Sequence, residues 1–574
     1  MKINKHIYTI AFTIGLLSTI SCTEGFEELN QDPNSFDKAP PENLFAGVVK
    51  NTLDLVGGVM NDQMYLNYAS YLGGKGGQFP RYFFTPSLNG YWDRFYVSIL
   101  KNNQEIIDNF GDNPEYNNRV HIARIWKAYV YSVLVSTFGP VPYEDALQAN
   151  TTVGYSSEEY IYTEILDLLK DAGTGITLDG DQLLQDPIFN GDNAMWIKFA
   201  NSLRLKIALR INNGFPSLAQ QHGTEAMADE ADLISSNAEN ISMQWGTQQE
   251  NWSFNYARYV FGDPSPDVVP YANFHFILNL KSYDDPRLPA LIDPGSGLII
   301  QDTLLASGST TNSVVVRYEA PYFGRTLAGT RPLDAWGLDG NDNILNGLDV
   351  TSFSQPDSER FFAQDMKYYI ITFAEMNFIK AEAKLLGWGG ASSVEDYYYA
   401  GIDASFEQLE VVGAAEYKEQ DGIKWGTESQ GDRDIFGVVS SGISADPLDK
   451  IVRQRWIALY HHGHDAWCLQ KRTRLLPVIP HFAPDGSVDG TYVQIPERMV
   501  YALTESGINA EGYSNAVSML GGDNLYTPLK INKEYQSIDW AGLSAEYNQE
   551  FASDWYGNSV DDLIAAGVNY EIVE

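Results

Sequence analysis

The chain has 574 residues, of which 75 are acidic and 38 are basic, so its formal net charge is −37. A surface this negative repels nucleic acids, anionic lipid head groups and polyanionic polymers unless a local basic patch intervenes, and the composition therefore favours neutral ligands. Aromatic residues make up 13% of the chain, and tyrosine, with 35 copies, outnumbers phenylalanine, with 27. Most of these rings should fill a core, but a tyrosine hydroxyl also lets a ring lie half in water.

The first thirty residues predict export and lipidation. A basic start precedes a mostly apolar run from Ile7 to Ile20, which is followed by Ser21 and Cys22. The run is shorter than the about 20 residues that a helix needs to cross a bilayer, which argues against a permanent membrane span. We expect a signal peptide over residues 1–21 and a tether over residues 22–40 lipidated at Cys22, with an ordinary cleaved signal as the alternative.

The number of cysteines and the absence of a linker limit the possible disulfides and the number of domains. Cys22 and Cys468 are the two cysteines, so lipidation of Cys22 would leave Cys468 as a lone thiol. No stretch rich in serine, glycine and proline interrupts the sequence. We therefore expect one large domain over residues 41–574, with a core of its own.

Helical periodicity dominates that domain. Apolar residues recur at spacings of three and four in segments 118–138, 194–211, 366–386, 447–460 and one that opens at Ser393. Gly139-Pro140 ends the first segment, and Ser393 is a good N-cap for its own.

The predicted helix over 194–211 also carries basic residues between its apolar positions, namely Lys198, Arg204, Lys206 and Arg210. This spacing is typical of a solvated or ion-paired flank and not of a nucleic-acid-binding stripe.

The helices at 366–386 and after Ser393 are joined by a short turn, which predicts an antiparallel pair. Such pairs are the unit of tetratricopeptide-type packing, although no clear 34-residue repeat is present. The expected fold class is mainly α, with helix pairs as scaffold. Between the helices lie stretches with little periodicity, at 73–90, 244–270, 293–346 and 477–528. Long ordered loops are commonly functional, so we expect them to form the working surface.

The segment Trp196–Leu205, preceded by Phe189–Asp192, resembles the central helix signature of the SusD/RagB family of nutrient-binding outer-membrane lipoproteins. Further blocks resemble that family in the expected order, at Phe26–Asn34, Phe138–Ala146, Asp285–Leu288, Phe373–Ala383 and Gln454–Tyr460. Together these blocks cover nearly the whole chain.

The resemblance implies a fold, a place and a partner. It implies a SusD-like fold, lipid anchoring on the extracellular face of the outer membrane, and a role as the lid of a SusC-like TonB-dependent transporter. Such proteins capture oligosaccharides or, in some members, peptides, and they are not catalysts. The resemblance implies no cofactor and gives no binding residue, because the matching blocks are mostly helical.

Candidate ligand-binding residues therefore come from the chemistry of sugars. A sugar ring is recognised by flat aromatic faces together with planar hydrogen-bonding groups. Three loop clusters combine the two kinds of residue. The first is Tyr82, Tyr91, Trp92, Asp93 and Arg94; the second is Trp252, Asn255, Tyr256 and Arg258; the third is Tyr322, Arg325, Arg331, Asp334 and Trp336. The competing interpretation is that these side chains anchor the loops to the helices.

Two short motifs suggest metals but fit them poorly. His461-His462-Gly463-His464-Asp465 has the ligand types of a zinc or nickel site, yet it directly follows a helix, and we interpret its histidines as surface residues without a metal. The segment Asp339–Asn343 suggests a calcium loop, but it lacks the glycine and the closing acid that such a loop needs. We find no phosphate-binding loop, nucleophile elbow or zinc-protease motif.

Three alternatives to glycan capture stay open at this stage. Glycoside hydrolysis needs two carboxyl groups, one with a raised pKa, and a chain with 75 acidic residues cannot be judged on spacing alone. Peptide capture would suit an acidic rim, which favours cationic peptides. The chain could also bind ligand only in complex with the transporter. We expect no enzymatic activity.

Overall fold

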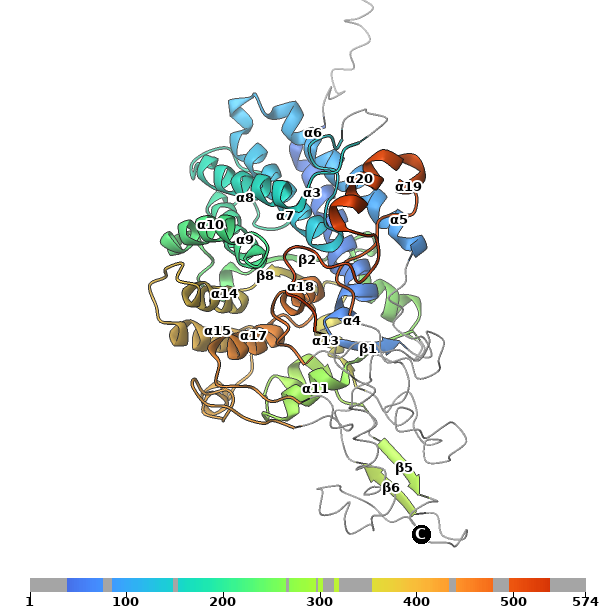
Figure 1. The fold of residues 1–574 in the computed structure, drawn as a ribbon, viewed down its shortest axis with the longest axis vertical. Helices are drawn as coiled ribbons and strands as arrows, with labels where there is room; N and C mark the ends of the chain where they lie inside the picture. The colour runs from blue at the N-terminus through green and yellow to red at the C-terminus, as the bar shows by residue number, and fades with distance from the viewer. Residues whose placement is uncertain are drawn as a thin grey trace, which may run out of the picture.

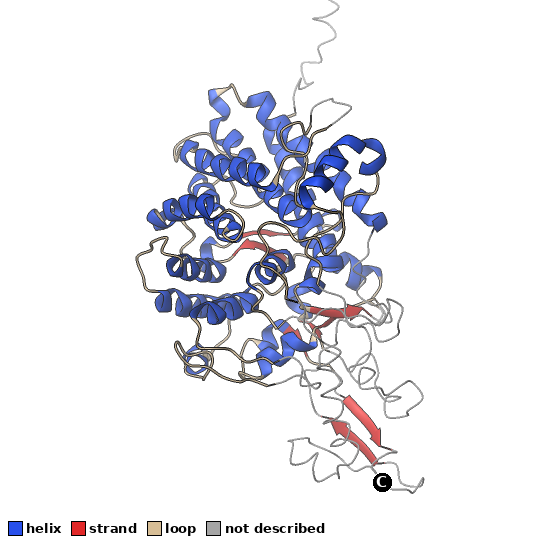
Figure 2. Ribbon diagram, in the orientation of Figure 1, coloured by secondary structure: helices blue, strands red, loops and turns tan. Residues whose placement is uncertain are grey.

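The computed structural model describes residues 39–75, 85–147, 153–264, 268–295, 298–302, 314–318, 354–432, 440–477 and 495–536. Within these ranges the molecule is mainly helical, with a few short strands (Figures 1 and 2). The predicted fold class is confirmed. Cys22 and the segment Asp339–Asn343 lie outside the described residues.

The N-terminal layer consists of helical segments that run on from one another. The first run comprises α3 (Pro41–Leu53), the π-helical segments η1 (Asp54–Val59) and η2 (Asn61–Tyr65), and α4 (Leu66–Tyr68). The second comprises α5 (Thr85–Asp93), the π-helical η3 (Arg94–Leu100) and α6 (Lys101–Phe110). The two runs pack on each other and on α7.

Long helices stacked side by side form the scaffold, on the left of Figure 1. They are α7 (Asn117–Phe138), α8 (Glu158–Gly175), α9 (Asn193–Ile211), α10 (Pro216–Ala228), α14 (Phe373–Leu385), α15 (Val394–Leu409) and α17 (Pro447–Ala458). Consecutive helices pair, α7 with α8, α9 with α10, and α14 with α15. The pairs also contact each other, through α8 and α9 and through α10 and α14, so each helix covers the apolar face of its neighbours.

Local capping fixes where the predicted helices begin. The Asp192 side chain accepts hydrogen bonds from the amides of Ala194 and Met195 at the start of α9. Ser393 and Asp396 form a complete capping box at the start of α15. These bonds satisfy amides that have no partner inside the helix. The predictions for 118–138, 194–211, the helix after Ser393 and 447–460 are confirmed to within about two residues.

The prediction of one helix over 366–386 is wrong at its start. Residues Lys367–Ile371 form strand β8, and α14 begins only after Thr372, whose side chain accepts from the amide of Glu375. β8 pairs in antiparallel fashion with β2 (Ile241–Gln244), from Ile241 opposite Ile371 to Gln244 opposite Lys367. Aromatic and β-branched side chains favour a strand here.

The remaining strands also form two-stranded antiparallel sheets. β1 (Leu72–Lys75) pairs with β3 (Pro270–Ala272), β4 (Ile292–Asp293) with β7 (Gln355–Pro356), and β5 (Leu298–Asp302) with β6 (Val314–Tyr318).

Shorter helices complete the described part of the chain. They are α11 (Phe274–Lys281), α12 (Leu288–Leu291), α13 (Ser358–Phe361), α16 (Ala414–Lys418), α18 (Gly463–Thr473), α19 (Glu505–Ile508), α20 (Ala510–Leu520), the π-helical η8 (Tyr256–Gly262), and the 3₁₀ turns η4 (Pro114–Tyr116), η5 (Glu230–Asp232), η6 (Asn237–Glu239) and η7 (Gln249–Asn251). The expectation that 477–528 lacks regular structure is wrong where α19 and α20 lie.

Tryptophan dominates the core. Trp126, Trp196, Trp456 and Trp467 are fully buried in one continuous apolar cluster that joins the N-terminal layer to the scaffold. The indole N–H of Trp126 donates to Thr52, and that of Trp456 donates to the carbonyl of Ala69. Each of these indoles therefore buries a large apolar area without leaving its polar group unsatisfied.

A cluster of buried charges lies beneath β8. Lys206 on α9 donates to Glu375 at 3.0 Å and to Asp465 at 2.7 Å, and Arg210 reaches the other oxygen of Asp465 at 2.6 Å. Arg455 donates to the second oxygen of Glu375 at 2.9 Å. Two of the basic residues predicted on this helix are thus ion-paired, and they are buried instead of solvated.

Candidate functional site

The residues predicted in the first loop lie mostly inside the molecule. Tyr91 and Trp92 are each 6% exposed, because they belong to α5 and not to a loop. The Trp92 ring packs edge-on against Phe138 and Tyr501, at 5.4 and 6.1 Å between ring centroids. The structure therefore places these two rings as packing groups.

Two further residues of this cluster lie at its edge. Asp93 is exposed, and Arg94 is partly buried and donates to the carbonyl of Asn51 at 3.4 Å. Burial lowers the pKa of Arg94. Tyr82 lies outside the described residues, as do Tyr322, Arg325, Arg331, Asp334 and Trp336 of the third cluster.

The second predicted cluster forms an aromatic surface. The ring of Trp252 lies 5.0 Å from that of Tyr256 and 5.0 Å from that of Phe261, measured between centroids. Phe261 is 62% exposed, and Arg258, three residues earlier, is exposed too. Trp252 and Tyr256 are partly buried. We call Trp252, Tyr256 and Phe261 the aromatic platform. Sequence reasoning missed Phe261, although it stands five residues after Tyr256 in the same segment.

Hydrogen bonds to the segment before β8 hold the platform in place. The side chain of Ser253 donates to the carbonyl of Ala363 at 2.7 Å, and buried Asn255 donates to the carbonyl of Phe361 at 2.9 Å. The amide of Gln364 donates to the Tyr256 hydroxyl at 2.9 Å. Asn255, which was predicted to bind ligand, therefore serves as an anchor, while the rings of its neighbours stay at the surface.

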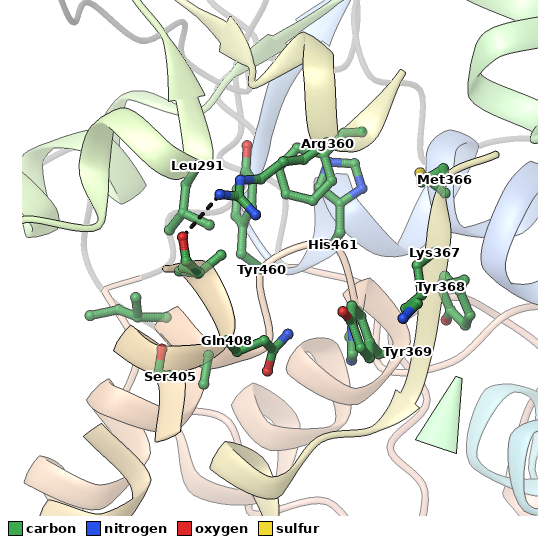
Figure 3. A pocket seen from close by; sticks show the side chains of 15 residues that line it. Leu291, Arg360, Met366, Lys367, Tyr368, Tyr369, Ser405, Gln408, Tyr460 and His461 are labelled. Atoms are coloured by element: carbon green, nitrogen blue, oxygen red, sulfur yellow. Dashed lines mark hydrogen bonds between the residues drawn. The ribbon is translucent and has the colours of Figure 1, made fainter. Parts of the chain in front are cut away.

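A pocket of about 220 Å³ borders the same segment, with Phe361 and Met366 among its lining residues (Figure 3). Its walls come from α12, α13, β8, α15, the end of α17 and the turn that follows. The lining residues are Leu291, Arg360, Phe361, Met366, Lys367, Tyr368, Tyr369, Ser405, Gln408, Leu409, Ile457, Ala458, Tyr460, His461 and His462. Sequence reasoning did not predict this pocket, because its walls come from segments far apart in the chain.

Three buried polar atoms of residues that line the pocket have no hydrogen-bond partner within the described ranges. They are the Tyr460 hydroxyl, Nε2 of His461 and Nδ1 of His462, on side chains that are 4%, 7% and 5% exposed. Burial lowers the pKa of His462 to about 4 and holds that of His461 well below its ordinary value, so both rings are neutral at pH 7. Each neutral ring offers one donor and one acceptor.

The mouth of the pocket carries positive charge. Arg360 and Lys367 are both exposed, and the lining contains no carboxylate. Arg360 donates to the carbonyl of Leu409 at 2.9 Å, the contact drawn in Figure 3, and neither head group forms an ion pair in the part of the chain that the structure describes.

The motif His461–Asp465 lies at the back of this pocket, and the prediction that its histidines are on the surface is wrong. All three imidazoles are buried. His461 stacks on Phe361, with 3.6 Å between ring centroids and 3° between planes. Within the described residues no group of three His, Cys, Asp or Glu side chains could hold a metal ion.

Two hydrogen bonds with Asn61, which we call the clasp, join the turn of this motif to the N-terminal layer. The side chain of Asn61 donates to the carbonyl of His461 at 2.7 Å, and the amide of Gly463 donates to Asn61 Oδ1 at 3.0 Å. A Cβ on Gly463 would lie 2.5 Å from the backbone nitrogen of Leu66, so the close approach requires glycine.

His464 and Cys468 face away from the pocket, toward the buried charges. Nε2 of His464 lies 3.0 Å from the hydroxyl of Ser136 and 3.8 Å from the free thiol of Cys468. Burial raises the pKa of Cys468, but His464, Arg210 and Lys471 together outweigh it and lower that pKa to about 6.

No helix in the described ranges is long and apolar enough to cross a membrane.

Comparisons with known proteins place the chain among similar sequences and folds. A family model, SusD-like and described as starch-binding and associating with the outer membrane, matches residues 33–502. None of the curated proteins matches this sequence. Among solved structures, a chitin-binding SusD homologue from Flavobacterium johnsoniae is 21% identical, with a TM-score of 0.67 over 87% of this chain and 100% of its own. A SusD homologue from Bacteroides uniformis is 20% identical, with a TM-score of 0.67 over 86% of this chain and 99% of its own.

Proposed function

The chain belongs to the SusD-like family, described as starch-binding and associating with the outer membrane, and we propose that it is a surface lipoprotein that captures oligosaccharides for uptake. Members of this family are binding proteins and not enzymes. The observation that carries the proposal for this chain is the aromatic platform, where Phe261 is exposed and Trp252 and Tyr256 are only partly buried, although most of the described rings lie in the core.

The platform has the properties that sugar binding needs. Hydrogen bonds fix its segment: Ser253 bonds to Ala363, the indole of Trp252 donates to the carbonyl of Thr247, and the Tyr256 hydroxyl accepts from Gln364, so binding costs little ordering of the protein. Phe261 offers an open face, and Arg258 adds a planar group that can donate to sugar hydroxyls. Two of the similar solved structures are of chitin-binding proteins, which makes chito-oligosaccharides a natural first probe.

Anchoring and partnership complete the proposal. Acylation of Cys22 would tether the domain through the segment that precedes α3, on the outer face of the outer membrane. There the chain would act as the lid and capture subunit of a SusC-like TonB-dependent transporter. Co-purification of the two proteins from detergent-solubilised outer membranes tests that partnership directly.

Calorimetric titration of the mature protein, residues 24–574, with chito-, malto- and mixed neutral oligosaccharides tests the ligand class. We expect binding that W252A or F261A weakens by at least about tenfold, because a stacked aromatic ring at the centre of a site carries much of the binding energy. The control is Y160A, which removes an exposed ring of α8, outside the platform. It should leave affinity unchanged.

The other outcomes distinguish the alternatives. Heat with oligopeptides alone would make the chain a peptide-capturing member of the family. Silence with every ligand, followed by binding in the purified complex, would mean that the site is completed by the transporter. Oligosaccharide binding that W252A and F261A leave intact would remove the platform from the proposal.

A further inference from the structure

We infer that residues 525–533, which we call the strap, are held on the domain by the protonated side chain of Glu158 and open when that side chain ionises. The strap follows α20, and in Figure 1 this part of the chain, drawn in red, runs toward α18. The inference is independent of the proposed function, because it concerns how the domain is closed and not what the domain binds.

The strap contains neither helix nor strand, and a few separate contacts hold it. Leu525, Leu529 and Ile531 place buried side chains in the main core. The amide of Lys533 donates to the carbonyl of Lys471 on α18 at 2.9 Å. Such a segment can open while the helices stay folded, because local opening exposes less apolar surface than global unfolding does.

The middle of the strap meets the start of α8 and the end of α9. The amide of Lys530 donates to Oε1 of Glu158, the first residue of α8, at 3.3 Å. Asn213, just after α9, donates to the carbonyl of Ile531 at 3.4 Å. A Cβ on Gly214 would lie 2.7 Å from the carbonyl oxygen of Lys530, so the strap lies directly on the backbone there. Opening the strap would therefore give the Glu158 carboxyl group access to water.

Glu158 is a buried carboxyl group without an ion pair. Its residue is 4% exposed, and its Oε2 has no hydrogen-bond partner in the part of the chain that the structure describes. A carboxylate removed from water needs several hydrogen bonds or a cation, whereas a neutral carboxyl group needs far less. The closed strap therefore favours the protonated form, and the ionised form favours an open strap that admits water.

The cations near Glu158 are engaged elsewhere and do not cancel this penalty. The ammonium group of Lys471 donates to two backbone carbonyls at 3.1 Å each. Arg498 donates to a backbone carbonyl at 3.0 Å and forms an ion pair with Asp523. The side chain of Lys530 is exposed, so water screens its charge.

The direction of the pH effect agrees with this geometry. Burial raises the pKa of Glu158 to about 7, and the backbone bond and the three cations lower that pKa only in part. The nearby hydroxyls of Tyr162 and Tyr501 have raised pKa values and stay neutral over this range. The carboxyl group returns to its ordinary pKa of 4.5 when the strap is open, so its contribution to closure is complete below that pH and is lost as the pH rises to about 7. This linkage makes opening up to roughly 70-fold more favourable at pH 8 than at pH 5.

The test is hydrogen–deuterium exchange of the full mature protein at pH 5 and pH 8, with each rate divided by the intrinsic exchange rate at that pH. We expect the opening of the strap amides in the wild-type protein to increase at least about tenfold from pH 5 to pH 8. E158Q keeps the shape of the side chain and removes the titration, so its strap should open equally at both pH values. E159Q, at the exposed neighbouring residue, should behave as the wild type does.

A second variant opens the strap without changing the titrating group. G214A places a methyl group against the carbonyl of Lys530, so it should raise the exchange of the strap at pH 5 as well as at pH 8. Wild-type exchange in G214A at pH 5 would mean that the strap is not packed on this backbone, and the inference would fail.

Three further results would overturn the inference. They are strap exchange in the wild-type protein that does not respond to pH, the same pH response in E158Q, and an equal increase in α14 and α15, which would indicate loosening of the whole domain. None of these measurements uses a ligand. Their failure would leave the proposed function standing, and a failure to bind oligosaccharides would leave the strap assignment standing.

Discussion

The buried charges beneath β8 and the polar wall of the pocket lie on opposite sides of one turn, and they differ in how completely their groups are paired. His464 and Asp465 point into the charge cluster, where both oxygens of Glu375 and both of Asp465 accept from cations. Tyr460, His461 and His462 line the pocket, where three polar atoms have no partner among the described residues. Within six residues the chain passes from a network in which every carboxylate oxygen is paired to three buried side chains that each leave one polar atom unpaired. The difference shows that burial alone does not ensure pairing, and that the paired side of the turn is the one that stabilises the fold.

Glu375→Gln should have the largest effect on this contrast. The carboxylate is fully buried and neutralises Lys206 and Arg455, so its loss leaves two buried cations undercompensated. Breaking a buried ion pair costs about 3–5 kcal/mol, whereas an exposed pair contributes at most about 1 kcal/mol. Denaturant unfolding should show that loss of unfolding free energy for E375Q and a far smaller one for E419Q, which disrupts the exposed pair with Lys424. Equal losses of unfolding free energy in the two variants would show that the buried charge cluster does not stabilise the fold.

Glu158→Gln tests a buried carboxylate that is only half paired. One oxygen accepts from the amide of Lys530 at 3.3 Å, and the other has no partner among the residues that the structure describes. Burial raises the pKa of Glu158 to about 7, so the folded state holds a proton that the unfolded state has released.

The sign of the pH effect follows from that shift. Stability linked to Glu158 is fully present below its unfolded pKa, near 4.5, and is lost as the pH rises to about 7. E158Q removes this loss, so it should be nearly neutral at pH 4.5 and stabilising by about 2–3 kcal/mol at pH 8. Thermal unfolding at both pH values measures the difference, with E159Q at the exposed neighbouring residue as control. A gain that is the same at both pH values would contradict the assignment.

Tyr460→Phe should have the smallest effect on stability. Replacing an unpaired buried hydroxyl by hydrogen is close to neutral and can stabilise by up to about 1 kcal/mol. The free energy of unfolding of the ligand-free protein is the measurement. A loss above about 1 kcal/mol would mean that the hydroxyl already has a partner, and the contrast between the two sides of the turn would disappear.

The fold was largely predictable because its signals are local. Asp192 and Ser393 mark helix starts by capping, and apolar spacing gives the helix bodies. The start of α14 was not predictable in this way, because Met366–Ile371 is apolar enough to continue the helical pattern that follows it. The sequence Tyr368–Ile371 followed by Thr372 was the available signal, since β-branched and aromatic residues before an N-cap favour a strand.

The site was predictable only in part. Trp252 and Tyr256 were chosen as loop aromatics, and the structure brings them together at the surface. Trp92 met the same criterion, but it lies on a helix whose packing buries it, and a sequence alone does not show which side a ring faces. The pocket depends on Arg360, Gln408 and His461 meeting from separate elements, a proximity that no spacing in the sequence encodes.

The clasp between Asn61 and the turn at His461–Gly463 also governs when the pocket can form. The two hydrogen bonds join residues 400 and 402 positions apart, so closing them requires most of the chain to have been synthesised and ordered. Contacts this distant in sequence form late, because the entropy of closing the loop must be offset by structure made earlier. During synthesis the N-terminal helices emerge long before α18 can dock on them. A nascent or truncated chain could therefore display helices, but the Tyr460–His462 wall takes its place only when the two ends of the domain have met.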